Sequence, residues 1–155
     1  MFRTLIAAGA AVAALSGAAF AQDYRLSPSF GQTTLQAGFT GDPRTVSLQS
    51  GGPIDASGVA SGCRGYIADA PDYRVSYTAG PTFPLILSVE AGADTTPVIT
   101  APNGAWYCDD DSGNGVNSSV RFSSPQSGRH DIWVGAHASA SLQQATLFIS
   151  EVSSR

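Results

Sequence analysis

The chain has 155 residues and a formal net charge of −4 at pH 7, with twelve acidic residues against eight basic ones. All eight basic residues are arginines, and they form no cluster. This acidic balance excludes nucleic acid and anionic membrane surfaces as expected partners, because both attract basic patches.

Residues 1–21 have the pattern of a secretory signal peptide that is cleaved on export. Arg3 supplies the positive start, Leu5–Leu15 the apolar segment and Ala19–Ala21 the small-x-small cleavage signal. The apolar segment is shorter than the roughly 20 residues that a membrane-spanning helix needs. We therefore expect a periplasmic or secreted protein with no membrane span in its mature chain. That mature chain, residues 22–155, is long enough for a single domain that buries about two thirds of its unfolded surface.

Short extended segments separated by Gly- and Pro-rich turns follow the signal peptide. Tyr73, Val75 and Tyr77 alternate with polar residues, as in a half-buried strand. No apolar period of 3.6 residues reaches helical length. The predicted strands are Thr33–Gln36, Thr45–Gln49, a segment beginning at Ile54, Tyr66–Asp69, Tyr73–Thr78, Phe83–Val89, Val98–Thr100, Ala105–Cys108, Val116–Phe122, His130–Val134 and Ala145–Ser150.

Many short strands with frequent turn signals predict an all-β fold. We expect a single antiparallel β-sandwich or a jelly-roll-like domain. Residues 22–70 would supply N-terminal strands, and residues 72–151 the larger part of the domain.

The two cysteines, Cys63 and Cys108, both belong to the expected exported part of the chain. An oxidised pair is the natural interpretation in that compartment. The chain has no further thiol or nearby histidine for a zinc site and no C-x-x-C motif for redox chemistry. We therefore predict a structural disulfide, which contributes about 4 kcal/mol in the chain-entropy model.

An acidic loop follows Cys108, where three adjacent aspartates repel one another unless a cation or solvent relieves them. Calcium prefers six to eight oxygen ligands on a flexible, Gly-bearing loop. The alternative is an exposed polar hairpin loop, in which Asp and Gly serve only the turn geometry. Both interpretations stay open, and the candidate calcium ligands are Asp94, Asp109, Asp111, Asn114 and Asn117.

Four motifs occur in a characteristic order between residues 94 and 135: D-T-T-P-V-I, P-N-G, D-D-D-S and P-Q-S-G-R-H-D-I-W-V-G. Their order resembles the bacterial pre-peptidase C-terminal domain, which is similar to the collagen-binding domains of secreted clostridial collagenases. The resemblance covers about residues 72–151. It implies a small β-sandwich that accompanies a secreted peptidase without being one, and several such domains bind calcium.

The chain departs from that family pattern at two positions. Thr96 stands where the family has a second aspartate, and His130 where its last strand has a tyrosine. Because His130 is in phase with Ile132 and Val134, we expect it to point towards the core. His137 lies in a turn of small residues, where we expect it to be solvated.

Trp106 and Trp133 are candidate binding residues near the acidic loop. An exposed tryptophan stacks on a sugar ring or fits a groove of a protein partner. Strand alternation places Trp133 on the face opposite Ile132 and Val134. The alternative is that one or both tryptophans cover the second face of the sheet or pack against the disulfide, as large aromatic side chains often do.

A peptidase is disfavoured, although Asp111-Ser112-Gly113 echoes the nucleophile motif of trypsin-like enzymes. The preceding residue is Asp110 instead of glycine, both histidines follow Ser112, and no G-x-S-x-G elbow occurs. We therefore expect an exported non-catalytic binding or accessory module that recognises a protein or polysaccharide. A self-associating structural protein of the cell envelope is the alternative, followed by a small secreted serine hydrolase.

Overall fold

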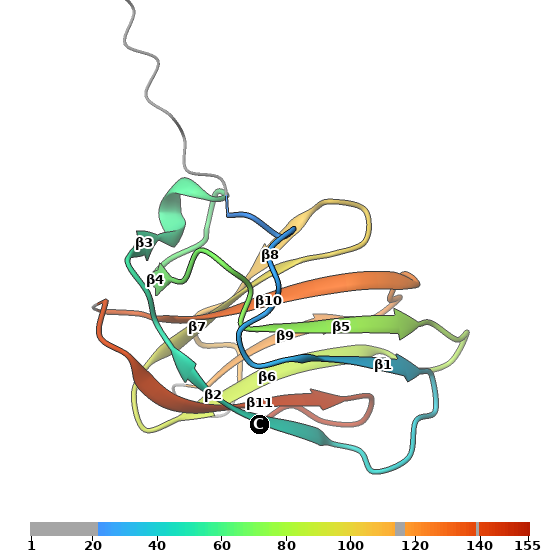
Figure 1. Cartoon of the computed structure of the whole chain (residues 1–155). Helices are drawn as coiled ribbons and strands as arrows, with labels where there is room; N and C mark the ends of the chain where they lie inside the picture. Colours follow the sequence, from blue (N-terminus) through green and yellow to red (C-terminus); the bar gives the residue numbers. More distant parts are fainter. Residues whose placement is uncertain (1–21, 114–116, 139) are drawn as a thin grey trace, which may run out of the picture.

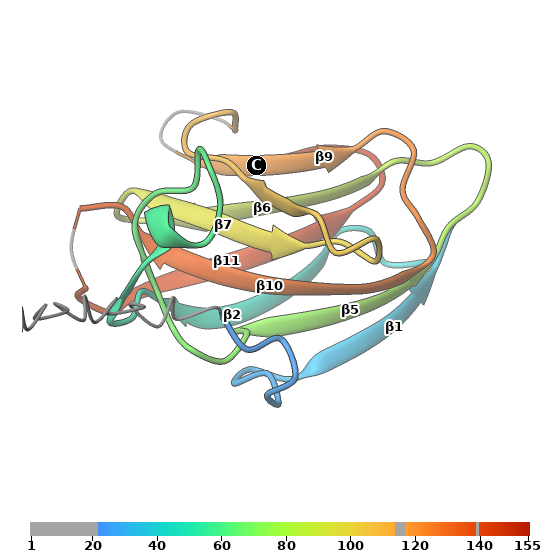
Figure 2. The same ribbon diagram turned by 90° about the horizontal axis from the view of Figure 1, so that it is seen from above.

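The computed structural model describes residues 22–113, 117–138 and 140–155. The expected signal peptide at residues 1–21 lies outside this part of the chain, as does Asn114 of the predicted calcium ligands. Two β-sheets lie face to face and form a sandwich (Figures 1 and 2). The all-β sandwich that the strand pattern predicts is therefore confirmed.

The first sheet is built around the long strand β10. On one side β10 pairs with β5, which in turn pairs with β1, and on the other side it pairs with β7, followed by β8. β3 and β4 extend the sheet at the far end of β10. The strands are β1 (Gln32–Gln36), β3 (Ile54–Asp55), β4 (Tyr66–Ile67), β5 (Tyr73–Thr78), β7 (Thr95–Thr100), β8 (Trp106–Cys108) and β10 (Gly128–Ala136).

The second sheet has the order β2-β11-β6-β9. One pairing departs from the expected antiparallel sandwich, because β1 runs parallel to β5. A hairpin cannot join parallel strands, so the chain between β1 and β5 crosses to the second sheet and returns. The strands of this sheet are β2 (Arg44–Ser50), β6 (Leu85–Ala91), β9 (Ser118–Phe122) and β11 (Gln143–Ser150).

The main core lies between the sheets. Side chains from β5, β6, β10 and β11 meet there, among them Val75, Leu87, Ile132 and Leu147, all with no exposed area. Burial of each such aliphatic side chain contributes roughly 1.5–3 kcal/mol. The alternation that predicts β5 is confirmed, since Tyr73, Val75 and Tyr77 are all buried.

A second, smaller core lies on the outer face of the first sheet. The segment from β3 to β4, which includes a 3-10 helix at Ala56–Gly58, covers this face (Figure 2). It packs Ala56, Cys63 and Ile67 against Trp133 and neighbouring residues. The extended segment predicted from Ile54 ends after Asp55, because the Asp55 carboxylate accepts a hydrogen bond from the Ser57 N–H and starts the helix.

The disulfide between Cys63 and Cys108 is present, with 5.2 Å between the two Cα atoms. It joins the covering segment to β8 across 45 residues of sequence. Both cysteines belong to the second core or pack against it. The predicted disulfide is therefore confirmed, and it holds the covering segment on the sheet.

His130 points into the core, as its phase with Ile132 and Val134 predicts. Its side chain has no exposed area, and its ring meets that of Phe122 edge-on, with 5.2 Å between the centroids. Neither ring nitrogen has a hydrogen-bond partner among the described residues. Burial lowers the pKa of His130. This outweighs the opposing influence of the Asp131 charge and of the Gly128 and Val75 backbone groups, which lie near the ring without the geometry of a hydrogen bond.

Candidate functional site

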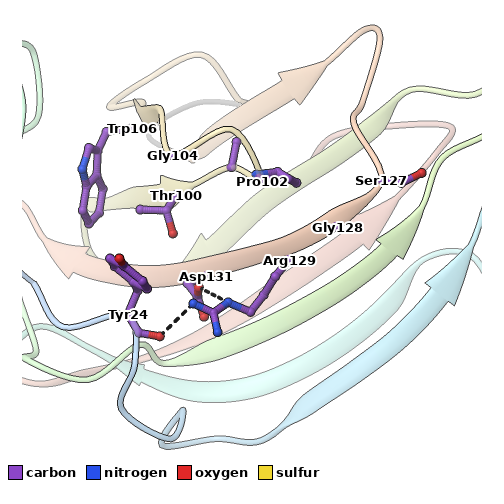
Figure 3. A pocket seen from close by; sticks show the side chains of 10 residues that line it. Tyr24, Thr100, Pro102, Gly104, Trp106, Ser127, Gly128, Arg129 and Asp131 are labelled. Carbon is purple, nitrogen blue, oxygen red and sulfur yellow. Dashed lines mark hydrogen bonds and ion pairs between the residues drawn. The ribbon is translucent and has the colours of Figure 1, made fainter.

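A groove of about 540 Å³ opens on the outer face of the first sheet (Figure 3). The β7–β8 hairpin forms one wall, the start of β10 forms the floor, and Tyr24 of the N-terminal segment lies opposite Trp106. This volume is within the range typical of ligand sites. The lining residues are Tyr24, Thr100, Ala101, Pro102, Gly104, Trp106, Ser127, Gly128, Arg129 and Asp131.

Asp131 organises the floor of the groove. Its carboxylate is only 2% exposed and pairs with two arginines: Arg74 Nε lies 2.5 Å from Oδ1, and Arg129 Nε lies 2.8 Å from Oδ2. Both arginines also donate to the Tyr24 carbonyl, at 2.7 Å and 3.2 Å. Arg74 further donates to the Leu26 carbonyl at 3.1 Å. The buried aspartate thus holds two guanidinium groups, and these fix the N-terminal segment beside the groove.

The groove presents one partly exposed guanidinium, that of Arg129, in an acidic protein. Arg74 and Arg129 bring two positive charges to the one negative charge of Asp131. The Arg129 side chain is 42% exposed, and its guanidinium lies over the Tyr24 ring, 5.5 Å from the centroid. Its bonds to Asp131 and Tyr24 use only some of its five N–H donors. Arg129 can therefore still bind an anionic group.

A glycine allows the hairpin to approach β10 closely. A Cβ atom at Gly128 would lie 2.7 Å from the Pro102 Cβ, and the φ angle of Gly128 is 139°, a value that other residues rarely adopt. The tip of the β7–β8 hairpin and the start of β10 therefore meet at one edge of the groove.

The two candidate binding tryptophans have different positions. Trp106 lies half-buried at the wall of the groove, with its ring centroid 5.3 Å from that of Trp133. Trp133 has no exposed area, and its indole N–H donates to the Asp69 carbonyl at 3.2 Å. Its predicted side of the strand is correct, but its role as a surface binding residue is wrong because the β3–β4 segment covers it. Trp133 is instead a core residue against which the Trp106 ring packs.

Sequence reasoning missed Tyr24, Arg129 and Asp131 as groove residues. A signal for two of them was available in β10, where Arg129 and Asp131 alternate with His130 and so share the face of Trp133. No local pattern marks Tyr24, because its position depends on contacts with residues far along the chain.

The predicted calcium ligands make different contacts in the structure. Both Asp109 carboxylate oxygens accept hydrogen bonds: Oδ2 from the Ser112 N–H of the loop at 2.9 Å and from the Ser119 N–H of β9 at 2.8 Å, and Oδ1 from the Ser112 hydroxyl. The Asn117 carbonyl accepts from the Gly113 N–H at 2.8 Å. These contacts correspond to the turn interpretation of the loop.

Asp94 is brought together with Asp110 and His137, a combination that the sequence did not predict. The Nδ1 atom of His137 lies 3.0 Å from Asp94 Oδ2, and its Nε2 atom lies 3.6 Å from Asp110 Oδ2. The expectation that His137 is simply solvated is therefore wrong: the side chain is 38% exposed but lies between two carboxylates. These three residues, called the rim cluster below, form a group that could hold a metal ion.

The charges around Asp94 act in opposite directions. Burial raises the pKa of Asp94, His137 lowers it, and Asp110 and Asp111 raise it, with a net upward shift. Asp111, a predicted calcium ligand, is thus near Asp94, although its own side chain is exposed.

Ser112, the residue of the trypsin-like echo, donates its hydroxyl proton to Asp109. Among the described residues, no hydrogen bond joins Ser112 to His137, whose ring faces Asp94 and Asp110. The described residues also include no helix that is long and apolar enough to cross a membrane.

No protein-family model matches the chain, and no curated protein matches it. Among solved structures, the fold is similar to the pre-peptidase C-terminal domain of a collagenase from Bacillus anthracis, at 12% identity and a TM-score of 0.47, over 81% of this chain and 99% of that one. It is also similar to a periplasmic inhibitor of g-type lysozyme from Aeromonas hydrophila, at 14% identity and a TM-score of 0.37, over 77% of this chain and 96% of that one. The first is the kind of domain that the sequence motifs resemble; both likenesses concern the fold alone.

Proposed function

We propose that the mature chain is an exported, non-catalytic β-sandwich module that binds a partner outside the cytoplasm through the groove of Tyr24, Trp106 and Arg129. The disulfide supports a location outside the cytoplasm, where such bonds persist. The sequence pattern of residues 1–21 agrees with export, to the periplasm or beyond the cell.

One observation carries this proposal: two aromatic rings and a guanidinium line the same groove. Aromatic walls with a few polar groups are the usual composition of a ligand site. Tyr24 is 43% exposed, and Arg129 is held in place by a buried carboxylate before any ligand arrives. A site that is already ordered loses less entropy on binding.

The chemistry of the groove favours a polysaccharide whose sugar rings carry carboxylates. A sugar ring presents a flat apolar face that suits Trp106 or Tyr24, and its carboxylate suits the bidentate donors of Arg129. Thr100 and Ser127 add hydroxyl groups at the edges. A protein partner that offers an acidic side chain beside an aliphatic one is the second candidate, because the same groups would bind it.

We propose a non-catalytic module because of the contacts that Ser112 and His137 make. Each side chain is engaged with aspartates, and the buried ring of His130 faces the core. Calcium at the acidic loop remains a prediction. Asp109 would have to give up its hydrogen bonds to Ser112 and Ser119 in order to join such a site.

The direct test is a titration of residues 22–155 with polygalacturonate, which carries a carboxylate on each ring, and with neutral dextran. Quenching or enhancement of tryptophan fluorescence reports on Trp106. We expect saturable binding of polygalacturonate that weakens with added salt, and much weaker binding of dextran. Absence of saturable binding to either polymer, together with saturable binding to a purified envelope protein, would favour the protein partner.

A further inference from the structure

We propose that the rim cluster of Asp94, Asp110 and His137 binds a divalent transition-metal ion of the Zn²⁺ type and so joins three loops at one end of the sandwich. The predicted calcium set differs from this cluster: it includes neither Asp110 nor His137. This inference is independent of the proposed groove function, because it uses no residue of the groove.

The topology brings the three residues together from distant parts of the chain. Asp94 precedes β7, Asp110 follows β8, and His137 follows β10. Strands β8, β7 and β10 are neighbours in the first sheet, so these ends lie side by side. The backbone N–H of His137 donates to the Asp94 carbonyl at 3.1 Å and fixes two of the loops relative to each other.

The three side chains offer a set of ligand atoms at close range. One nitrogen of His137 and one oxygen from each aspartate all lie within 4.8 Å of one another. Zinc ligands lie about 2.0–2.2 Å from the ion, which puts them roughly 3.4 Å apart in a tetrahedral site, so the ligand atoms must approach one another by up to about 1.4 Å. All three side chains are 35–38% exposed and stand on loops, where such an adjustment is available.

A second observation concerns the carboxylate oxygens that do not contact His137. Among the described residues, Asp94 Oδ1 and Asp110 Oδ1 are both buried atoms without a hydrogen-bond partner. The contacts with His137 use the other oxygen of each carboxylate. An unpaired buried carboxylate oxygen is costly, because it has lost water and gained no donor. Two carboxylates and a neutral imidazole carry a charge of about −2, which a divalent ion would balance.

The ligand types select the class of metal. Calcium and magnesium take oxygen ligands almost exclusively, whereas imidazole nitrogen suits zinc, nickel and copper. One nitrogen and two carboxylate oxygens with a water molecule would complete a tetrahedral zinc site. The ion would act as a clip between the loops that carry Asp94, Asp110 and His137, and so stabilise the folded chain.

The experiment uses an untagged mature chain, stripped with EDTA, and measures melting curves with ZnCl₂, CaCl₂ and MgCl₂. We expect Zn²⁺ at about a hundredfold excess over its Kd to raise the Tm by roughly 5–15 °C, and Ca²⁺ and Mg²⁺ to do much less. His137→Gln and Asp110→Asn should each weaken Zn²⁺ binding at least about tenfold. The matched control Asp111→Asn, an adjacent aspartate outside the cluster, should keep it.

Nitrogen-15 NMR of the imidazole rings gives a readout that does not depend on stability. The chain has only two histidines, and His130 is buried in the core. Zinc should therefore shift the ring nitrogens of His137 and leave those of His130 unchanged. Coincident melting curves with Zn²⁺ and with EDTA would overturn the proposal and leave the cluster as an ion pair. An equal response to Ca²⁺, lost in Asp111→Asn, would overturn it in favour of the acidic-loop calcium site.

Discussion

The Nε atom of Arg129 lies 2.8 Å from Asp131 Oδ2, a carboxylate that is almost completely buried beneath the groove. Arg74 of β5 pairs with the other oxygen of the same carboxylate and also donates to the Tyr24 carbonyl. Asp131 of β10 is therefore linked through its arginines to β5 and to the N-terminal segment. The position of Tyr24 therefore depends on a charge that is almost completely buried.

Asp131→Asn should weaken the fold and loosen the N-terminal segment together. The change leaves two arginines without their anion, and a hydrogen bond to a charged group contributes about 1.5–3 kcal/mol. Urea unfolding measures the loss of stability, and cleavage by protease near residues 22–26 measures the loosening. A variant with unchanged stability and unchanged cleavage would contradict the role assigned to Asp131.

Loss of the disulfide should release the segment that covers Trp133. We expect Cys63→Ala with Cys108→Ala to lower the free energy of unfolding by up to about 4 kcal/mol. Tryptophan fluorescence should also shift to the red, because Trp133 gains access to water. Reduction of the wild-type chain should reproduce both effects, and an identical emission spectrum in the oxidised and reduced proteins would argue against them.

Asp72 should make the protein less stable as the pH rises. Its side chain is buried and accepts a 2.6 Å hydrogen bond from the Val134 N–H, yet burial raises its pKa from 3.8 to about 7. A raised pKa in the folded state gives stability that is present below pH 3.8 and is lost as the pH rises towards 7.

Asp72→Asn should therefore be more stable than wild type at pH 8 and comparable to it near pH 4. Asparagine keeps an oxygen for the Val134 N–H without the charge. The largest difference is on the order of 4 kcal/mol, from about 1.4 kcal/mol for each pH unit. Urea unfolding at pH 4, 6 and 8 measures it, and parallel stability curves for the two proteins would rule out this role of Asp72.

His130 should make the protein less stable as the pH falls. Burial lowers its pKa in the folded state. The contribution of the neutral ring to folding stability is therefore present above pH 6.5, the ordinary pKa of histidine, and is lost as the pH falls below that value. When the pH is lowered from 7.5 to 5, the melting temperature of His130→Phe should therefore fall less than that of wild type. His137→Gln is the control, since that histidine is not buried, and an equal acid response in wild type and His130→Phe would refute the prediction.

Residues that alternate along one strand were predictable, whereas contacts between strands were not. The burial of Tyr73, Val75 and Tyr77 and the inward position of His130 follow from the two-residue period. The pattern also places Trp133 on the outer face, but it contains no information about the β3–β4 segment that covers that face. Burial of this tryptophan is a property of the chain path.

The acidic loop illustrates the same limit. Three adjacent aspartates look alike in sequence, yet Asp109 closes the loop, Asp110 meets His137 and Asp111 is exposed. Their roles depend on where β8 ends relative to β7 and β10. The prediction from sequence alone named Asp109 and Asp111 as calcium ligands and did not include Asp110.

The most direct test of the groove is the affinity for polygalacturonate of Arg129→Gln compared with Arg121→Gln, an exposed arginine on β9 of the other sheet. Isothermal titration at two salt concentrations measures both variants against wild type. If the groove is the binding site, Arg129→Gln weakens binding about tenfold or more, as expected for a lost charged hydrogen bond of about 1.5–3 kcal/mol. Arg121→Gln then binds as wild type does. Equal affinities for the two variants, or loss of binding in Arg121→Gln alone, would contradict a binding function of the groove.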